Sequence, residues 1–128
     1  MAGFSNYLEL KLLDHVLKNT AYTSPAVVYL AAYTSDPGEG NSGTEVSGGS
    51  YARVAITFGA AASGQSLNTA DVVFPTASGS WGTITHFAVF DASTAGNMLM
   101  FGALGASVAI ASGQRLRFEA GQLAVNLD

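Results

Sequence analysis

Short apolar segments separated by turn residues follow one another from Pro25 onward, and this pattern limits the fold more than any other feature of the sequence. The segments are rich in β-branched and aromatic residues, and Gly, Ser, Asn and Pro lie between them. Short strands in close succession predict a mainly β fold, a single antiparallel β-sandwich or a jelly-roll-like barrel. We expect about eight strands, over residues 26–34, 51–58, 72–74, 83–91, 98–104, 108–110, 115–119 and 123–127.

Two of these segments carry apolar side chains on both faces of the predicted strand. In segment 83–91, Ile84 and Ala88 alternate with Phe87 and Val89, and segment 26–34 is similarly apolar throughout. A strand that is apolar on both faces is buried on both faces. We therefore expect these two segments at the centre of the sheet.

The region before Pro25 has the periodicity of a helix instead. Leu8, Leu12 and Val16 recur at positions i, i+4 and i+8. Asn6 is followed three residues later by a glutamate, which is a variant of the capping box that starts many helices. The sequence predicts one N-terminal α-helix over about residues 6–18, followed by a β-sandwich over about residues 26–127.

The composition is that of one domain whose surface is poorly charged. A chain of 128 residues is long enough for one core, which we expect to span residues 1–128. Only 11% of the residues are charged, against about 25% in an ordinary soluble domain. Because charge normally keeps an exposed surface soluble, we infer that other proteins cover part of this one.

Charge and residue content also exclude several functions. The net charge of −4 argues against a nucleic-acid partner, which would need a basic stripe. No cysteine is present to form disulfides or thiolate metal sites. The longest apolar stretch, 98–111, is shorter than the ~20 residues of a spanning helix, and the apolar N-terminal stretch carries charges unlike a signal peptide. We expect no nucleic-acid and no membrane partner.

None of the motifs that resemble catalytic or ligand sites has the context that its chemistry needs. Gly38–Gly43 matches G-x-G-x-x-G, but the residues that follow start a helix poorly. The acids of the same loop lack the spacing of a calcium loop. His86 and Asp91 would lie on opposite faces of one strand. We therefore expect no enzyme activity, no metal and no cofactor.

The segments that a partner could order are the better candidates for function. They are Ala2 to Asn6, the Gly-rich loop Ser35–Ser50 and the loop around Trp81. Aromatic side chains at strand ends either anchor in a partner or cap the core, and the sequence leaves both interpretations open. The candidate interface residues are Phe4, Ser5, Asn6, Glu39, Asn41, Glu45, Tyr51, Arg53 and Trp81.

An ordered set of short motifs carries a resemblance to known proteins. The set includes Asn6-Tyr7-Leu8-Glu9, Leu12-Leu13-Asp14-His15, Tyr29-Leu30-Ala31, Gly43 to Arg53, Phe74-Pro75-Thr76-Ala77 and Trp81-Gly82. In this order the chain resembles a family of small tailed-bacteriophage virion proteins, often labelled phage tail fibre proteins. Similar small β-domains serve as capsid cement or decoration proteins. The resemblance implies a structural virion protein and brings no catalytic motif.

Size and charge then decide between positions in the virion. A compact chain of this length has a radius of gyration of about 14 Å and cannot form an extended shaft. The sparse charge favours several protein contacts for each subunit. We expect a capsid cement protein, made in the host bacterial cytoplasm, that forms a homotrimer and binds the assembled major capsid protein lattice on the capsid surface. The alternative is a small tail fibre or tail-tip component that binds a host receptor or glycan.

Overall fold

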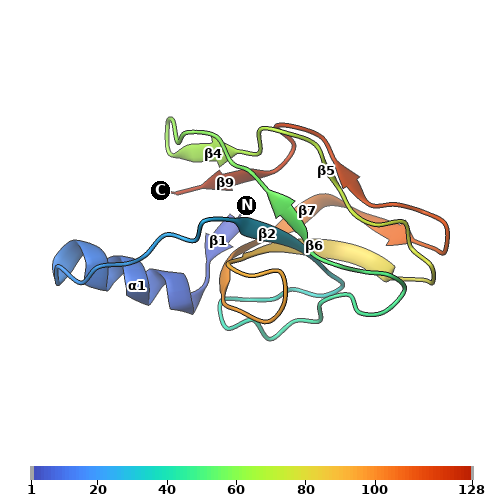
Figure 1. The fold of residues 1–128 in the computed structure, drawn as a ribbon, viewed down its shortest axis with the longest axis horizontal. Coiled ribbons are helices and arrows are strands. Elements are labelled where there is room, and N and C mark those ends of the chain that lie inside the picture. The colour runs from blue at the N-terminus through green and yellow to red at the C-terminus, as the bar shows by residue number, and fades with distance from the viewer. Residues whose placement is uncertain (1, 128) are drawn as a thin grey trace.

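A five-stranded antiparallel sheet organises the chain in the computed structural model, which describes residues 2–127 (Figure 1). Its strand order is β1-β7-β6-β2-β3, and every neighbouring pair is antiparallel. The two long strands, β6 and β7, contact each other more extensively than any other pair of elements. The strands are β1 (Ala2–Phe4), β2 (Val28–Tyr33), β3 (Val54–Ile56), β6 (Gly82–Phe90) and β7 (Met98–Ile110).

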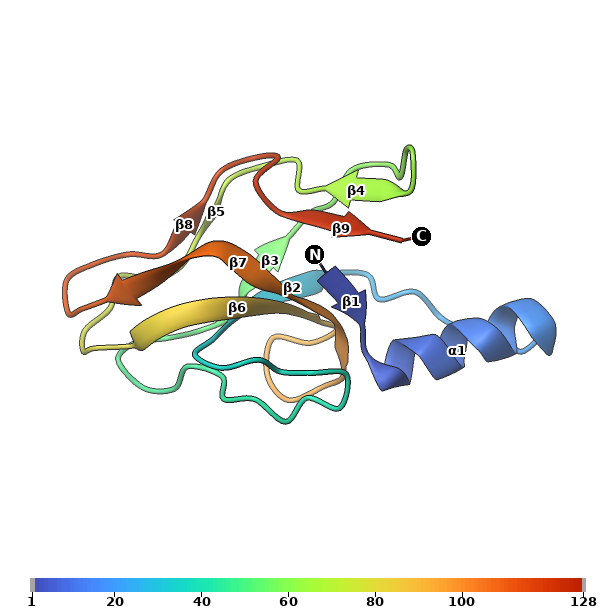
Figure 2. The ribbon, with the colours of Figure 1, turned by 180° about the vertical axis from the view of Figure 1, so that it is seen from behind.

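Two small two-stranded sheets form a second layer over one face of this sheet (Figure 2). One pairs β4 (Gln65–Leu67) with β9 (Ala124–Asn126), and the other pairs β5 (Val72–Val73) with β8 (Arg117–Phe118). The main core fills the space between the layers, and its largest fully buried members are Phe74, Leu30, Ile84 and Val89. The expected mainly β, antiparallel fold is confirmed; the strands do not close into a barrel.

The central strands are buried on both faces, as their composition predicts. In β2, Leu30 and Ala32 belong to the core between the layers, whereas Ala31 and Tyr33 belong to a second cluster on the opposite face. The Tyr33 ring stacks on Phe90 with their centroids 6.5 Å apart. The β2–β3 and β6–β7 connections cover this second face (Figures 1 and 2).

Strand β7 is longer than the sequence suggests. We expected two strands, 98–104 and 108–110, because Gly105 and Ser107 interrupt the apolar run. The structure has one strand, and the interruption appears as a register shift against β6: Ile84 pairs with Val108 while His86 pairs with Ala103. The extra residues of β7 form a bulge, which lets a strand bend without ending.

The helix α1 (Asn6–Leu17) has the predicted bounds within one residue, but its cap is a different residue. Ser5, not Asn6, is the N-cap, and the Ser5 Oγ accepts a hydrogen bond from the Leu8 backbone N–H at 3.2 Å. The same hydroxyl donates to the Met98 carbonyl of β7, so the cap also fixes the start of the helix against the sheet. From there α1 projects away from the two layers (Figure 2). The described residues contain no helix that is long and apolar enough to cross a membrane.

Candidate interaction surfaces

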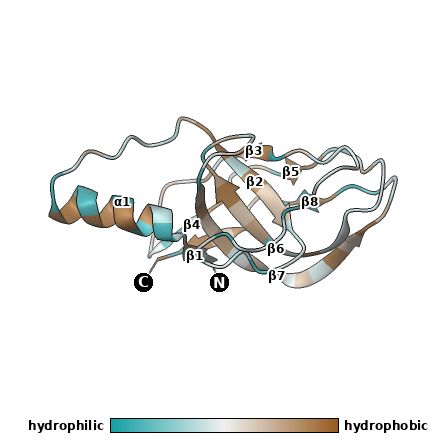
Figure 3. Cartoon of the chain, turned by 90° about the horizontal axis from the view of Figure 1, so that it is seen from below, coloured by the Kyte–Doolittle hydropathy of each residue, from teal (hydrophilic) through white to brown (hydrophobic). Residues whose placement is uncertain are grey.

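Helix α1 exposes an apolar face along most of its length. Leu10, Leu13, Val16 and Leu17 are 64%, 55%, 73% and 78% exposed, and Leu8 is the one residue of the helix that is buried. With 3.6 residues per turn, the four exposed side chains fall within an arc of about 120°. In Figure 3, where the ribbon is coloured by hydropathy, apolar residues recur along the part of the helix that extends beyond the sheets. We call these four residues the α1 face.

The exposure of the α1 face is uncommon in a soluble domain. Burying an aliphatic side chain completely contributes about 1.5–3 kcal/mol of stabilising free energy. Covering the four exposed side chains would therefore add several kcal/mol. Large exposed apolar patches usually mark an interaction site. The periodicity of the sequence predicts the helix but not this exposed face. One residue of the sequence does indicate this face. Leu10 lies outside the stripe of Leu8, Leu12 and Val16, and a helix that packs a single stripe against the core does not need a leucine there.

Four of the predicted interface residues meet where α1 begins. Ser5, Asn6, Glu39 and Asn41 line a shallow polar hollow of about 250 Å³. The Asn6 backbone N–H donates to the Glu39 carbonyl at 3.0 Å, and the Tyr33 hydroxyl donates to Asn41 Oδ1 at 2.7 Å. The N-terminal segment and the Gly-rich loop, far apart in sequence, therefore share one surface.

Phe4 takes no part in this hollow. It lies on β1, paired with Met100 of β7, and its half-buried ring packs against the main core. Within the isolated chain its contacts are those of a core residue.

Three other predicted interface residues form an ion-pair cluster within the chain. The Arg53 guanidinium donates to both Glu45 carboxylate oxygens at 2.8 and 2.9 Å, and the Tyr51 hydroxyl donates to the same carboxylate at 2.7 Å. Arg53 also donates to the Ala92 and Ala95 carbonyls at 3.0 and 2.7 Å. The cluster therefore holds the β6–β7 connection against the segment before β3.

Burial shapes the ionisation of this cluster. Burial and the hydrogen bond to Glu45 raise the pKa of Tyr51 above its ordinary range. Burial and the nearby Glu45 charge raise the pKa of Tyr33 to about 12. Burial acts to lower the pKa of Arg53, but its hydrogen bonds to Glu45 outweigh this and raise it. The charges of Glu45 and Arg53 are thus neutralised inside the chain.

Trp81 is a core residue, and the expectation that it anchors in a partner needs correction. The side chain is 4% exposed and packs edge-on against Tyr51 and Phe74, with centroid distances of 5.4 and 6.2 Å. Its indole N–H donates to the Gly49 carbonyl at 2.9 Å. Gly49 has φ +57°, and an added Cβ would lie 3.0 Å from the indole nitrogen. The ring therefore caps the core, the second of the two interpretations that the sequence left open.

The charged groups of the Gly-rich loop do not assemble a metal site. Asp36 lies 3.9 Å from the His86 ring, and Glu45 is held by Arg53. Among residues 2–127, no three or more His, Cys, Asp or Glu side chains gather as metal ligands would.

Comparison with known proteins places the chain in a family. No curated protein matches it. The family model of the podophage GP4 fiber I protein gp80 matches residues 3–126, which is nearly the whole chain. The match agrees with the resemblance to phage tail fibre proteins that the sequence motifs carry. The chain therefore belongs to the podophage GP4 fiber I protein gp80 family and is a structural component of the phage virion.

Proposed function

We propose that the protein is a non-enzymatic structural subunit of a phage fibre, and that it assembles into a homotrimer through the α1 face. The family match supports the fibre role. The observation that carries the assembly is the exposure of Leu10, Leu13, Val16 and Leu17 on a helix that projects from the sheets.

The spacing of the α1 face suits copies of the same helix. Leu10 and Leu17 are seven residues apart with Leu13 between them, which corresponds to heptad positions a, d and a. Val16 then takes a g position and widens the apolar seam. A seam wider than a and d alone suits a bundle of more than two helices. The polar residues Lys11 and His15 fall on the opposite side, where a trimer leaves them in water.

The energy of this contact is of the order that association requires. Completing the burial of four half- to three-quarter-exposed side chains gives about 1–2 kcal/mol for each. Association costs about 4–15 kcal/mol in lost freedom. Because gain and cost are similar, we expect a trimer whose population rises with protein concentration and with the local concentration in a virion.

The oligomeric mass tests this proposal. In light scattering over a concentration series, the wild-type chain should approach three times its 13.1 kDa mass. Leu13→Glu combined with Leu17→Glu should remain monomeric, because it places two charges in the seam. Lys11→Glu on the polar side is the matched control and should trimerise normally. A wild-type chain that stays monomeric at millimolar concentration overturns the proposal.

The competing position is the capsid, where the protein would be a cement that binds the major capsid protein. That hypothesis draws on the sparse surface charge. Copy number separates the two roles, since a fibre subunit is present in far fewer copies than the major capsid protein and a cement approaches its abundance. Quantitative staining of purified virions on a gel measures this ratio. A ratio near one would reject the fibre role and support the cement.

A further inference from the structure

One side of β7 is left unpaired over half the strand. β1 pairs with this side only at Met100, Phe101 and Gly102. From Ala103 to Ile110, no strand among residues 2–127 lies on that side, since the sheet order places β6 on the other. The open stretch, Ala103–Ala109, carries no charge and no proline, two of the devices that protect a strand edge; the bulge of β7, a third such device, lies within it.

Strand β8 has a second open edge. Val72 pairs with Phe118, and the Phe74 N–H donates to the Leu116 carbonyl at 2.9 Å, so these residues of the β8 segment direct their backbone groups to the β5 side. Because backbone groups alternate in direction along a strand, Arg115 and Arg117 direct theirs away from β5. No backbone partner pairs with them among the described residues.

A groove of about 600 Å³ lies between β7 and the β8–β9 segment. Its backbone walls are the open stretch of β7 and the residues from Arg115 to Asn126. Phe87, Leu116, Phe118 and Leu123, all members of the main core, lie at its base, and Leu104 and Val108 line it from β7. The groove is thus an opening into the core at the place where the two layers fail to close.

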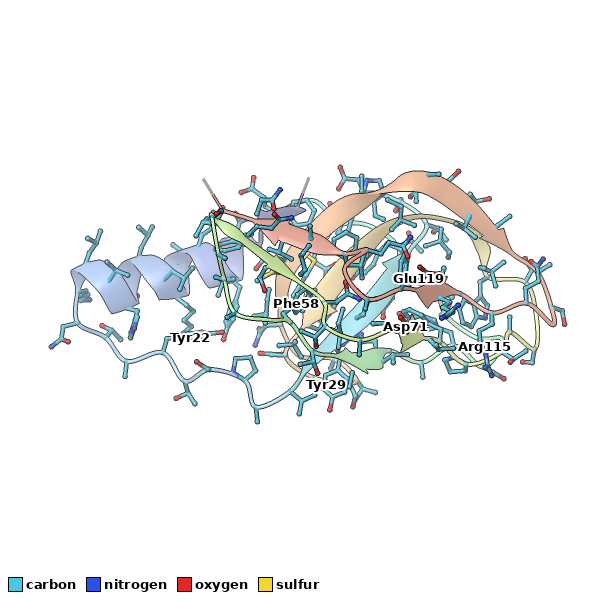
Figure 4. The ribbon with its side chains drawn as sticks, turned by 90° about the horizontal axis from the view of Figure 1, so that it is seen from above. Tyr22, Tyr29, Phe58, Asp71, Arg115 and Glu119 are labelled. Carbon is cyan, nitrogen blue, oxygen red and sulfur yellow. The ribbon has the colours of Figure 1, made fainter. Side chains whose placement is uncertain are left out.

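The two charged residues that line this groove are both basic. Of the five basic residues, Lys11 and Lys18 lie along and at the end of α1, and Arg53 is bound to Glu45. The other two, Arg115 and Arg117, both line the groove. Figure 4 shows Arg115 on the same side of the molecule as Asp71 and Glu119.

Of the two arginines that line the groove, Arg115 is the one without an ion partner among residues 2–127. The Arg117 guanidinium is bound to the Asp71 carboxylate, with Glu119 nearby. Arg115 is exposed and forms no salt bridge among residues 2–127. A carboxylate on a partner segment would form an ion pair with the Arg115 guanidinium.

We propose that the groove binds an extended, acidic segment of a different protein chain, which adds a strand along the open edge of β7. Backbone hydrogen bonds to β7 would supply affinity, and apolar side chains at alternate positions would enter the groove. A carboxylate on the outward-facing side would pair with Arg115. A glycan fits less well, because the groove aromatics Phe87 and Phe118 are each 5% exposed and offer no open ring for a sugar to stack on.

Synthetic peptides test the proposal on the full-length chain. The probes are about nine residues long, near the upper end of the usual range of strand lengths. They alternate valine with threonine, and one threonine is replaced by aspartate, asparagine or lysine. The aspartate peptide should bind about two- to fivefold more tightly than the asparagine peptide, as expected for one exposed ion pair. Arg115→Glu should reverse the order of the aspartate and lysine peptides.

Hydrogen exchange identifies the site. Bound peptide should slow exchange at backbone amides within 103–109, because strand addition protects them. Gly105→Trp should block the groove and weaken binding at least about tenfold. An added Cβ at Gly105 meets nothing within 4 Å, so this variant should fold. Ala61→Trp, on an exposed loop that does not line the groove, is the matched control and should bind normally.

Each outcome decides the proposal. Binding that protects β7 amides, prefers the acidic peptide and is lost in Gly105→Trp supports it. No binding by any peptide at millimolar concentration overturns it, as does binding without β7 protection or without preference for the carboxylate. Binding of an anionic oligosaccharide in place of the peptides assigns the groove to a glycan. A change in oligomeric mass in Gly105→Trp assigns it to a second copy. The α1 variants leave these results unaffected, so the two proposals fail independently.

Discussion

The Arg53 guanidinium holds the Glu45 carboxylate with two hydrogen bonds while its carbon lies 3.6 Å from the centre of the Phe90 ring. The pair is largely inside the molecule, with side-chain exposures of 8% for Arg53 and 24% for Glu45. Tyr33, stacked on the same Phe90 ring, is bridged through its backbone to Glu45. These contacts hold the Gly-rich loop and the β6–β7 connection against the face of the five-stranded sheet that is opposite the second layer.

We predict that Arg53→Lys lowers the free energy of unfolding by about 2–4 kcal/mol. Lysine keeps the charge but loses the two-point hydrogen bonding, the contacts to the Ala92 and Ala95 carbonyls and the stacking on Phe90. Urea denaturation measures the change. Arg115→Lys, at an exposed position with no ion pair within the described chain, is the control and should have little effect. Equal stability of both variants would show that the cluster does not stabilise the fold.

The helix cap provides a matched pair of substitutions. Ser5→Ala removes the acceptor for the Leu8 N–H and the buried donor to Met98, and should cost about 1–2 kcal/mol of unfolding free energy. Asn6→Ala, one residue later and exposed, should cost much less. Thermal unfolding of the two variants measures the difference. A larger loss for Asn6→Ala would return the cap to the residue that the sequence pattern indicated.

Trp81→Ala should destabilise the chain and leave its assembly intact. Removing a buried indole from a core site typically costs about 3–5 kcal/mol, and here it also leaves the Gly49 carbonyl without its donor. The melting temperature should fall sharply. At a temperature where the variant is folded, its oligomeric mass should equal that of the wild type. A normal melting temperature with lost assembly is the contrary result, and would make Trp81 an interface anchor.

The contact between α1 and the Gly-rich loop should weaken as pH rises. Partial desolvation, then the hydrogen bond to Glu39 and its charge, raise the pKa of Glu9 above its ordinary 4.5. The folded chain therefore binds more protons here than the unfolded chain, so this site loses stability as pH rises from 4.5 through the raised value. Glu9→Gln removes the repulsion from Glu39 and should raise the melting temperature at neutral pH, with no gain well below pH 4.5, where the Glu9 carboxyl is protonated.

The stability contributed by the carboxyl of Asp71 changes with pH in the opposite direction. The contributions of Asp71 and Glu9 can therefore be measured separately. The hydrogen bond from the Ala120 N–H and then the Arg117 guanidinium lower the pKa of Asp71 below its ordinary 3.8. Its stabilisation is present above 3.8 and is lost as pH falls through the lowered value. Melting curves of Glu9→Gln against wild type at and above pH 4.5 therefore report the Glu9 site alone. A difference that does not change with pH in this range would contradict the assignment.

The parts of the fold that follow from local pattern could be predicted from the sequence. The helix bounds follow from the 3.6-residue periodicity, and the central positions of β2 and β6 follow from apolar residues on both faces. The short strands β1 and β4 have three residues each and no alternation to detect, so only tertiary pairing defines them. The continuity of β7 depends on a bulge, which composition does not show.

The candidate surfaces could be predicted only in part. The sequence named Ser5, Asn6, Glu39 and Asn41 as interface candidates, which stays a prediction, and the structure adds that the four line one hollow. The sequence could not show that Glu45 and Arg53 form an ion pair with each other, because their pairing depends on loop geometry. Nor could periodicity tell which apolar residues of α1 remain exposed, because that depends on how far the helix extends beyond the sheet.

The way α1 is joined to the sheet determines how a mechanical load would travel. The helix is inserted in the chain between β1, at one edge of the five-stranded sheet, and β2, near its middle. Tension applied to α1 therefore enters the sheet at two strands rather than one. Strand β1 is held by three residue pairs with β7, whereas β2 is paired on both sides, with β3 and with β6. Under sustained pulling the edge strand should detach first, leaving the helix tethered through the middle of the sheet.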